Sequence, residues 1–290
     1  MSRTTPVVNI GGRTLSAPGI PDRLILDVRR LATESVSGDP NRIVVVHGGG
    51  SEVTKLAGRL GITSEFLDGV RMTGEEEMDA VDMVLSGLVN KRVARRFEAA
   101  GVPAAGICGS DGGLITGEPV LRPDGTPSRT GRVSTVSPGL LEHLLSAGYL
   151  VVVASTIMDP DGHGLNLNAD DAALEIAKML SADTLVFLSD VPGIMRAGTE
   201  EEDRGTEAAP AGAASLESSR AGTEVIDRLT PEAAEAEIAS GSISGGMIPK
   251  VRSSIGALQA GVGTVIIGSY TEGVSLEQLI GGRSGTRIES

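Results

Sequence analysis

Short apolar runs alternate with stretches of helical periodicity along most of the chain. The β-branched run at 43–47 is typical of a buried strand, whereas Leu24, Val28 and Leu31 recur at the spacing of an amphipathic helix. The same pattern predicts strands at 7–10, 102–107, 149–155, 184–188 and 262–267, and helices at 51–60, 75–100, 140–147, 169–180 and 249–260. Such alternation is typical of βα units on a mainly parallel sheet, so the predicted fold class is α/β.

Three segments depart from this rhythm. Residues 112–136 contain short apolar pieces separated by Pro, Gly and Asp, which predicts an antiparallel hairpin laid over one end of the sheet. Residues 196–223 carry almost no large apolar side chain, which predicts a flexible surface insertion. Within the long helix at 75–100, Gly87 and the pair at 89–90 are expected to bend or divide it.

Two of the predicted strands end in glycines. His47 is followed by Gly48, Gly49 and Gly50, which open a helix, and the first strand runs into Gly11 and Gly12. A glycine turn at a helix N-terminus presents bare backbone N–H groups that can approach an anion closely, because no Cβ stands in the way. The turns therefore indicate a phosphate or carboxylate site, with a purely structural turn as the alternative.

Composition narrows the class of function. The chain has 290 residues, 2% aromatic residues and a net charge of −13, which disfavours nucleic-acid partners. The single cysteine, Cys108, rules out an intrachain disulfide, fits a reducing cytoplasm and is interpreted as a packing thiol. No apolar run reaches the roughly 20 residues that span a bilayer, and the N-terminus lacks a signal-peptide pattern, so we expect a cytoplasmic protein without a membrane partner.

Further candidate chemistry lies outside the glycine turns. Arg71 stands in a loop and offers the fork that binds carboxylates. Asn166 and Asn168 fall on one side of an extended segment, and Asp170 lies in the first turn of the next helix. Lys250 follows a pair of glycines at a helix start, as in a phosphate clamp. The alternatives are a surface arginine and a simple helix cap.

Taken in order, these segments resemble the amino-acid kinase superfamily, and most of all its N-acetylglutamate kinases. The matching pieces are 46–50, 69–73, 83–91, 166–170, 188–194, 246–250 and 285–288. The resemblance covers nearly the whole chain except 196–223. It implies a three-layer αβα sandwich around an open, mainly parallel sheet, with an acetylglutamate-binding lobe at 1–180 and an ATP-binding lobe at 181–290. It also implies transfer of the γ-phosphoryl of ATP to the side-chain carboxylate of N-acetyl-L-glutamate, a step of arginine biosynthesis.

The resemblance also assigns roles on the substrate side of the site. Gly49 and Gly50 are implied to hold the substrate through backbone N–H groups. Arg71 is implied to grip its α-carboxylate, with Asn166 assisting. Asp170 is implied to orient the lysines.

On the nucleotide side, Gly11 and Gly12 are implied to face the transferring phosphate, and Lys250 to neutralise charge. The implied lining of the nucleotide pocket is Asp190, Val191, Gly193, Ile194, Met195, Ile243, Ser244 and Met247. Mg²⁺ is expected to be bound mainly through the ATP phosphates, with no protein ligand. A carboxylate acceptor is already ionised at neutral pH, so the absence of a paired base in these motifs fits the chemistry.

One position departs from the family pattern. The family places a lysine in the first strand, where this chain has Asn9. Losing one transition-state cation typically costs on the order of 10²–10³ in rate. Three explanations are open: Arg13 supplies the charge, the enzyme turns over slowly on Lys250, Mg²⁺ and backbone donors, or the chain is a weakly active sensor paralogue.

Substrate and assembly also have alternatives. A sister kinase that acts on aminoadipate or glutamate carried by a small protein is the nearest one, and carbamate, glutamate 5- and uridylate kinases fit the nucleotide half less specifically. Only about five residues precede Val7, where arginine-inhibited hexameric members have an additional helix. We therefore expect a homodimer that arginine does not inhibit.

Overall fold

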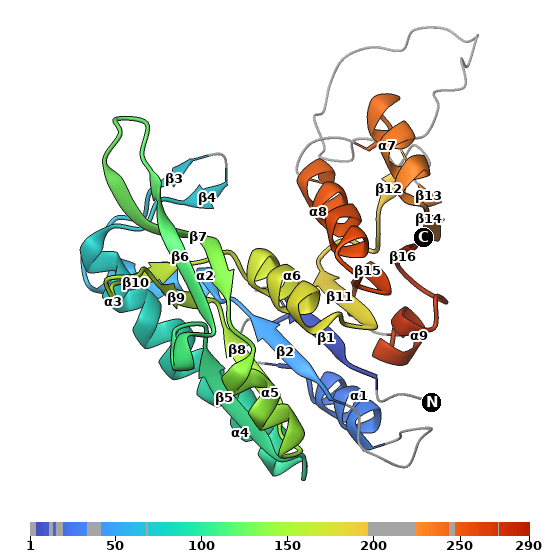
Figure 1. Cartoon of the computed structure of the whole chain (residues 1–290), viewed down its shortest axis with the longest axis horizontal. Helices are drawn as coiled ribbons and strands as arrows, with labels where there is room; N and C mark the ends of the chain where they lie inside the picture. Colours follow the sequence, from blue (N-terminus) through green and yellow to red (C-terminus); the bar gives the residue numbers. More distant parts are fainter. Residues whose placement is uncertain are drawn as a thin grey trace, which may run out of the picture.

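One mainly parallel sheet forms the centre of the protein. The computed structural model describes residues 4–11, 14–15, 20–33, 42–67, 69–196, 224–243, 247–271 and 273–290. In this part of the chain eight strands lie in the order β14-β16-β15-β11-β1-β2-β8-β5, and only β15 and β16 pair antiparallel (Figure 1). The strands are β1 (Pro6–Ile10), β2 (Val44–His47), β5 (Ala104–Cys108), β8 (Leu150–Ala154), β11 (Thr184–Ser189), β14 (Arg228–Leu229), β15 (Thr264–Ser269) and β16 (Thr286–Ile288).

Helices cover both faces of this sheet (Figure 1). One face carries α5 (Gly139–Ser146), α6 (Ala169–Leu180), α7 (Pro231–Ala239) and α8 (Met247–Gln259). The other carries α1 (Asp22–Thr33), α2 (Gly50–Arg59), α3 (Glu75–Asp82), η1 (Met83–Val89), α4 (Asn90–Ala99) and α9 (Leu276–Ile280). Within β2, Val44 and Val46 point into the first apolar core and Val45 into the second, as strand alternation requires. The expected αβα sandwich is confirmed.

A small closed barrel stands beyond the carboxyl end of β2 (Figure 1). It consists of β6 (Ile115–Leu121), β7 (Pro127–Val136), β9 (Thr156–Met158) and β10 (Gly164–Asn166), with the short η2 (Asp111–Gly113) leading in. The predicted hairpin at 112–136 is confirmed as β6 and β7, whereas β9 and β10 were not predicted. A second hairpin, β3 (Phe66–Leu67) with β4 (Val70–Arg71), lies beside the barrel.

The predicted helix at 75–100 forms without a gap, but its hydrogen-bond pattern changes along its length. α3 and α4 are joined by η1, a π-helical segment that contains Gly87. Sequence reasoning missed α9, although Ser275 and Gln278 form a capping box that signals its start. It also missed the small pair of β12 (Met195–Arg196) and β13 (Glu224–Val225).

The sheet runs across the predicted division into lobes 1–180 and 181–290. β1 pairs with β2 on one side and with β11 on the other, so the two parts share one sheet, and the division stays a prediction. Of the predicted insertion at 196–223, residues 197–223 lie outside the described residues. Every helix in the described ranges is too short or too polar to cross a bilayer.

Candidate active site

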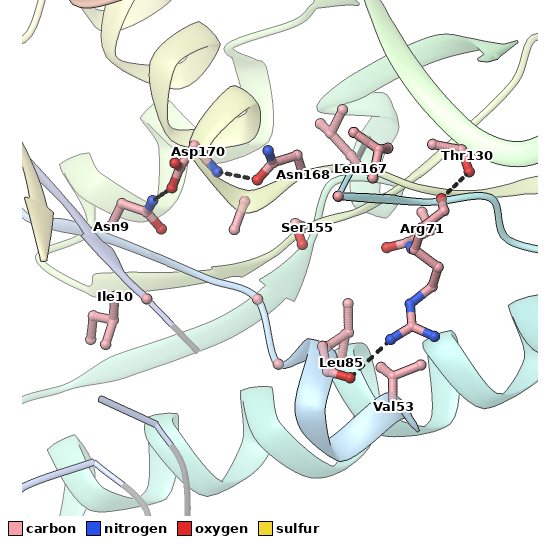
Figure 2. Close-up of a pocket in the computed structure, with 18 of the residues that line it drawn as sticks. Asn9, Ile10, Val53, Arg71, Leu85, Thr130, Ser155, Leu167, Asn168 and Asp170 are labelled. Carbon is pink, nitrogen blue, oxygen red and sulfur yellow. Dashed lines mark hydrogen bonds between the residues drawn. The ribbon is translucent and has the colours of Figure 1, made fainter. Parts of the chain in front are cut away.

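A cavity of about 320 Å³ opens where the carboxyl ends of β1 and β2 meet the β3–β4 hairpin and the start of α6 (Figure 2). Ligands of open α/β sheets bind at this edge, because loops there can be shaped without disturbing the core. Lys250 does not line this cavity, but nine other residues that the sequence singled out do: Asn9, Gly11, Gly48, Gly49, Gly50, Arg71, Asn166, Asn168 and Asp170. Segments up to 161 positions apart in the chain therefore meet in one place, as the resemblance implied.

The glycine turn after β2 forms one wall of the cavity. Gly49 caps α2 with a φ of +156°, and a Cβ on it would lie 2.9 Å from Leu85 Cδ2 of the π-helical segment η1. The first residues of α2 thus present backbone N–H groups to the cavity with no side chain in front of them. The wider π-helical turn places Leu85 at the cavity wall, and such segments often occur at functional sites.

A buried histidine supports the turn from behind. His47 Nδ1 lies 2.9 Å from the Gly48 carbonyl and Nε2 lies 3.2 Å from Asn90 Nδ2. Because Asn90 Nδ2 is a donor, Nε2 accepts and Nδ1 carries the proton that it donates to Gly48. Burial, which disfavours the charged ring, lowers the pKa of His47 to about 4. The neutral ring therefore fixes the direction of the Gly48 carbonyl at neutral pH.

The low pKa of His47 predicts how stability changes with pH. The unfolded chain binds a proton on His47 below about pH 6.5, whereas the folded chain does so only below about pH 4. The contribution of neutral His47 to the free energy of unfolding is therefore complete above pH 6.5. This contribution, about 3 kcal/mol, is lost as the pH falls to 4. We expect urea unfolding of His47→Gln to depend less on pH over this window than that of the wild type. The control is His143→Gln, at an exposed histidine of α5, which should show the same pH dependence of the free energy of unfolding as the wild type. An equal pH dependence for the wild type and His47→Gln would contradict the prediction.

Arg71 at the end of β4 is buried and firmly held. Its Nη1 donates to Glu77 Oε1 and Ser64 Oγ, both at 2.5 Å. Its Nη2 donates to the Gly50 carbonyl at 3.0 Å and to Thr54 Oγ1 at 2.7 Å. The guanidinium is thus fixed beside the N-terminus of α2. A carboxylate that binds here has to replace one of the neutral acceptors, with the Glu77 pair left in place.

Asn166 reaches the cavity from the barrel. Its Nδ2 donates to Thr73 Oγ1 at 2.9 Å, and Thr130 Oγ1 donates to the Arg71 carbonyl at 2.5 Å. Asn168 caps α6 by accepting from the Asp170 N–H at 3.0 Å, so the simple capping interpretation is confirmed for Asn168, which also lines the cavity. Thr130 was missed, because nothing local marks a barrel threonine as part of a site.

Opposite Arg71, one carboxylate joins the first strand to the C-terminal part of the chain (Figure 2). Asn9 Nδ2 donates to Asp170 Oδ1 at 2.5 Å, and Lys250 Nζ lies 3.1 Å from Asp170 Oδ2. Lys250 Nζ also lies 5.3 Å from the centroid of the Phe187 ring on β11, a cation–π contact that helps to hold the ammonium in place. The positions predicted for Asp170 and Lys250 in the first turns of α6 and α8 are confirmed.

The residues assigned to the nucleotide follow β11. Asp190 and Val191 come directly after the strand, and the Ile194 N–H donates to Thr286 Oγ1 at 2.7 Å. Ile194 and Ile243 are buried in one apolar core, against which Met247 packs. A Cβ on Gly193 would lie 2.7 Å from Thr286 Oγ1 and one on Gly11 the same distance from the Leu188 carbonyl, so both sites exclude a side chain. The nucleotide assignments stay predictions, and Gly12, Arg13 and Ser244 lie outside the described residues.

The family profile and the related sequences that match this chain agree on one family. A sequence profile of the Amino acid kinase family matches residues 4–269. Acetylglutamate kinase of Rubrobacter xylanophilus is 37% identical over 98% of this chain and 96% of its own length. Acetylglutamate kinase of Heliobacterium modesticaldum is 36% identical over 99% and 92%. These relatives match the chain almost end to end.

Solved structures agree on the fold. The structure of smu.665 from Streptococcus mutans aligns with a TM-score of 0.73 at 24% identity, covering 98% of both chains. A carbamate kinase from Giardia lamblia bound to AMP-PNP aligns with a TM-score of 0.65 at 16% identity, covering 100% of this chain and 99% of its own. At these identities the similarity concerns the fold alone.

Proposed function

The chain belongs to the amino acid kinase family, and we propose that it transfers the γ-phosphoryl group of ATP to the side-chain carboxylate of N-acetyl-L-glutamate. The product is an acyl phosphate, and the reaction is a step in arginine biosynthesis. Relatives named acetylglutamate kinase that match nearly the whole chain support this substrate. The enzyme is thus a phosphotransferase with a carboxyl acceptor.

The observation that carries the proposal is the layout of the cavity. One side holds Arg71 and the N–H groups that follow Gly49, which suit the carboxylates of the substrate. The other side holds Asp170, whose carboxylate pairs with Lys250 outside the lining of the cavity, and we assign this pair to the phosphate to be transferred. Phosphoryl transfer depends more on alignment of the two reactants and neutralisation of their charge than on proton transfer. These are the contributions that the protein has to make.

The nucleotide brings a metal ion into the proposal. Mg²⁺ bound to ATP neutralises phosphate charge and prefers oxygen ligands. The oxygens of Asn9 and Asp170 are not free to bind this ion. Asn9 Oδ1 is fully buried, without a hydrogen-bond partner among the described residues, and both Asp170 oxygens are taken by Asn9 Nδ2 and the Lys250 ammonium. Lys250 orients and neutralises the transferring group from the opposite side of the Asp170 carboxylate, and Asp170 itself moves no proton.

A direct assay tests this function. The purified chain is incubated with MgATP, with and without N-acetyl-L-glutamate, and ADP is followed while hydroxylamine traps the acyl phosphate. We expect ADP and hydroxamate in equal amounts, and only with acetylglutamate. Activity confined to a carrier-linked aminoadipate or glutamate would contradict the proposal, and so would tight ligand binding without ADP formation.

We also propose a cytoplasmic homodimer. Within the described part of the chain the sheet ends at β5, whose Ala104, Ala105 and Gly106 are only half-buried. Side chains of Glu98, Lys91 and Asp111 already bond the Ala104 N–H, the Gly106 carbonyl and the Cys108 N–H, so a second copy would pack against this edge without extending the sheet. Sedimentation should give about twice the chain mass of 29.6 kDa, and a monomer or hexamer would contradict this.

A further inference from the structure

A second cavity lies next to the active-site cavity. It has a volume of about 640 Å³ and lies between the β3–β4 hairpin, the barrel and α6. Val70, Thr130 and Asn168 line both cavities, so the two cavities meet at these residues. Val70 is 47% exposed and Asn168 is exposed as well, so this boundary is open rather than packed. A group that leaves the active-site cavity on this side enters the second cavity.

The walls of the second cavity suit an uncharged chain. Its apolar lining comes from three places: Leu67, Val70 and Met72 at the hairpin, Val120 and Val133 in the barrel, and Leu174 on α6. Asp171 and Glu175 add carboxylates from α6. Arg132 also lines the cavity, but its guanidinium is paired with Glu118 at 3.3 Å. An aliphatic group therefore fits these walls, whereas a group that ends in a carboxylate meets like charge.

The proposed substrate has one substituent that neither end of the active-site cavity accounts for. Arg71 is assigned to its α-carboxylate and the opposite end of the cavity to its side-chain carboxylate, so the α-carbon lies between them. Val53 and Leu85, which are 1% and 3% exposed, close the lower side of the cavity in Figure 2. Thr130 and Asn168 lie on the upper side. The acylated nitrogen therefore has to leave the α-carbon on the side of the second cavity.

We propose that this enzyme accepts L-glutamate with longer aliphatic acyl groups on its nitrogen, and that the acyl chain extends into the second cavity. The acetyl group is then the shortest member of the substrate class. The γ-phosphoryl group still passes from ATP to the side-chain carboxylate, and the amide bond is neither formed nor broken. Turnover of these compounds rests on the proposed kinase function, whereas their binding does not.

The expected effect follows from the apolar surface that the chain covers. A fully buried methylene group tightens binding by a factor of about four. Leu67 and Val70 are 42% and 47% exposed, so the walls bury a chain only in part, and about twofold per methylene is expected. N-hexanoyl-L-glutamate has four methylenes more than the acetyl compound. It should bind roughly tenfold more tightly.

The test is isothermal titration calorimetry of the nucleotide-free protein with a series of N-acyl-L-glutamates. We expect the dissociation constant to fall from the acetyl through the pentanoyl to the hexanoyl compound. N-succinyl-L-glutamate is the matched control ligand, because its acyl chain has the length of pentanoyl but ends in a carboxylate that faces Asp171 and Glu175. It should bind at least about tenfold more weakly than the pentanoyl compound.

A variant that fills the second cavity locates the chain. Val133 is half-buried and lines the second cavity but not the first, so Val133→Phe fills space beyond the shared residues. The ratio of the acetyl to the hexanoyl dissociation constant should fall from about ten to about one. Leu121→Phe adds similar bulk at a residue of β6 that is 61% exposed and outside both linings, and should keep the wild-type ratio. Because the readout is a ratio, a general weakening of binding cancels.

Three results would overturn the acyl site. They are weaker binding of the hexanoyl than of the acetyl compound, equal binding of the pentanoyl and succinyl compounds, and an unchanged ratio in Val133→Phe whose circular dichroism matches the wild type. The hydroxamate assay separates this proposal from the kinase function. Graded binding without ADP formation refutes the kinase proposal alone. Turnover of acetylglutamate without tighter binding of the longer compounds refutes the acyl site alone, and no binding of any compound refutes both.

Discussion

Replacing Lys250 with methionine is expected to lower kcat by about 10²–10³, because it removes the cation beside Asp170 that we propose neutralises the transferring phosphate. Methionine has a similar length and apolar stem, so the packing against Phe187 is largely kept. The pair with Asp170 is partly exposed, with side-chain exposures of 21% and 37%, and contributes little to stability. Steady-state kinetics with both substrates saturating measures the effect.

Lys178→Met is the matched control for this prediction. Lys250 pairs with Asp170, whereas Lys178 pairs with Glu175 on α6 at 2.8 Å. Its replacement should leave kcat within about twofold, since surface pairs of this kind have small effects. A loss of less than tenfold in Lys250→Met, or an equal loss in both variants, would show that Lys250 does not act on the transferring group.

Arg71→Lys is expected to raise the KM for N-acetyl-L-glutamate by roughly 10- to 100-fold while leaving the KM for ATP unchanged. Lysine keeps the charge but lacks the fork that holds a carboxylate through two nitrogens. Retaining the charge matters because Glu77 has a side-chain exposure of only 3%. Alanine would leave this carboxylate buried and unpaired, at a cost of about 3–5 kcal/mol.

Arg122→Lys provides the comparison for Arg71→Lys. Arg122 pairs with Glu65 near the same hairpin but does not line the cavity. We expect its kinetics to match the wild type. Thermal unfolding of both variants separates a binding defect from a folding defect. Equal increases in the KM for acetylglutamate and for ATP in Arg71→Lys would place Arg71 outside substrate binding.

Local sequence signals accounted for most of the fold. β1 and β2 were predicted because each is an apolar run that ends in a glycine turn, and α6 because an asparagine cap precedes it. Each of these signals lies within a few residues of its element. α9 and the β3–β4 hairpin were missed because they are short and carry little apolar periodicity.

The candidate site was predictable only in part. The glycine turns and Arg71 carry signals in their own segments, and the resemblance joined them. The contacts of Asn90 with His47 and of Thr130 with the Arg71 backbone bridge 43 and 59 positions. Such pairs depend on how the elements pack, which no local pattern records. The unpartnered oxygen of Asn9 likewise became visible only with its surroundings in place.

The position of β1 inside the sheet determines what a substitution within this strand can change. Every residue of the strand is buried, and its backbone is laddered to neighbours on both flanks. The backbone at residue 9 is therefore held firmly, and the direction in which the side chain leaves the strand does not depend on which residue is present. A change of side chain at position 9 therefore alters the group that faces Asp170 while leaving the strand pairing of β1 in place.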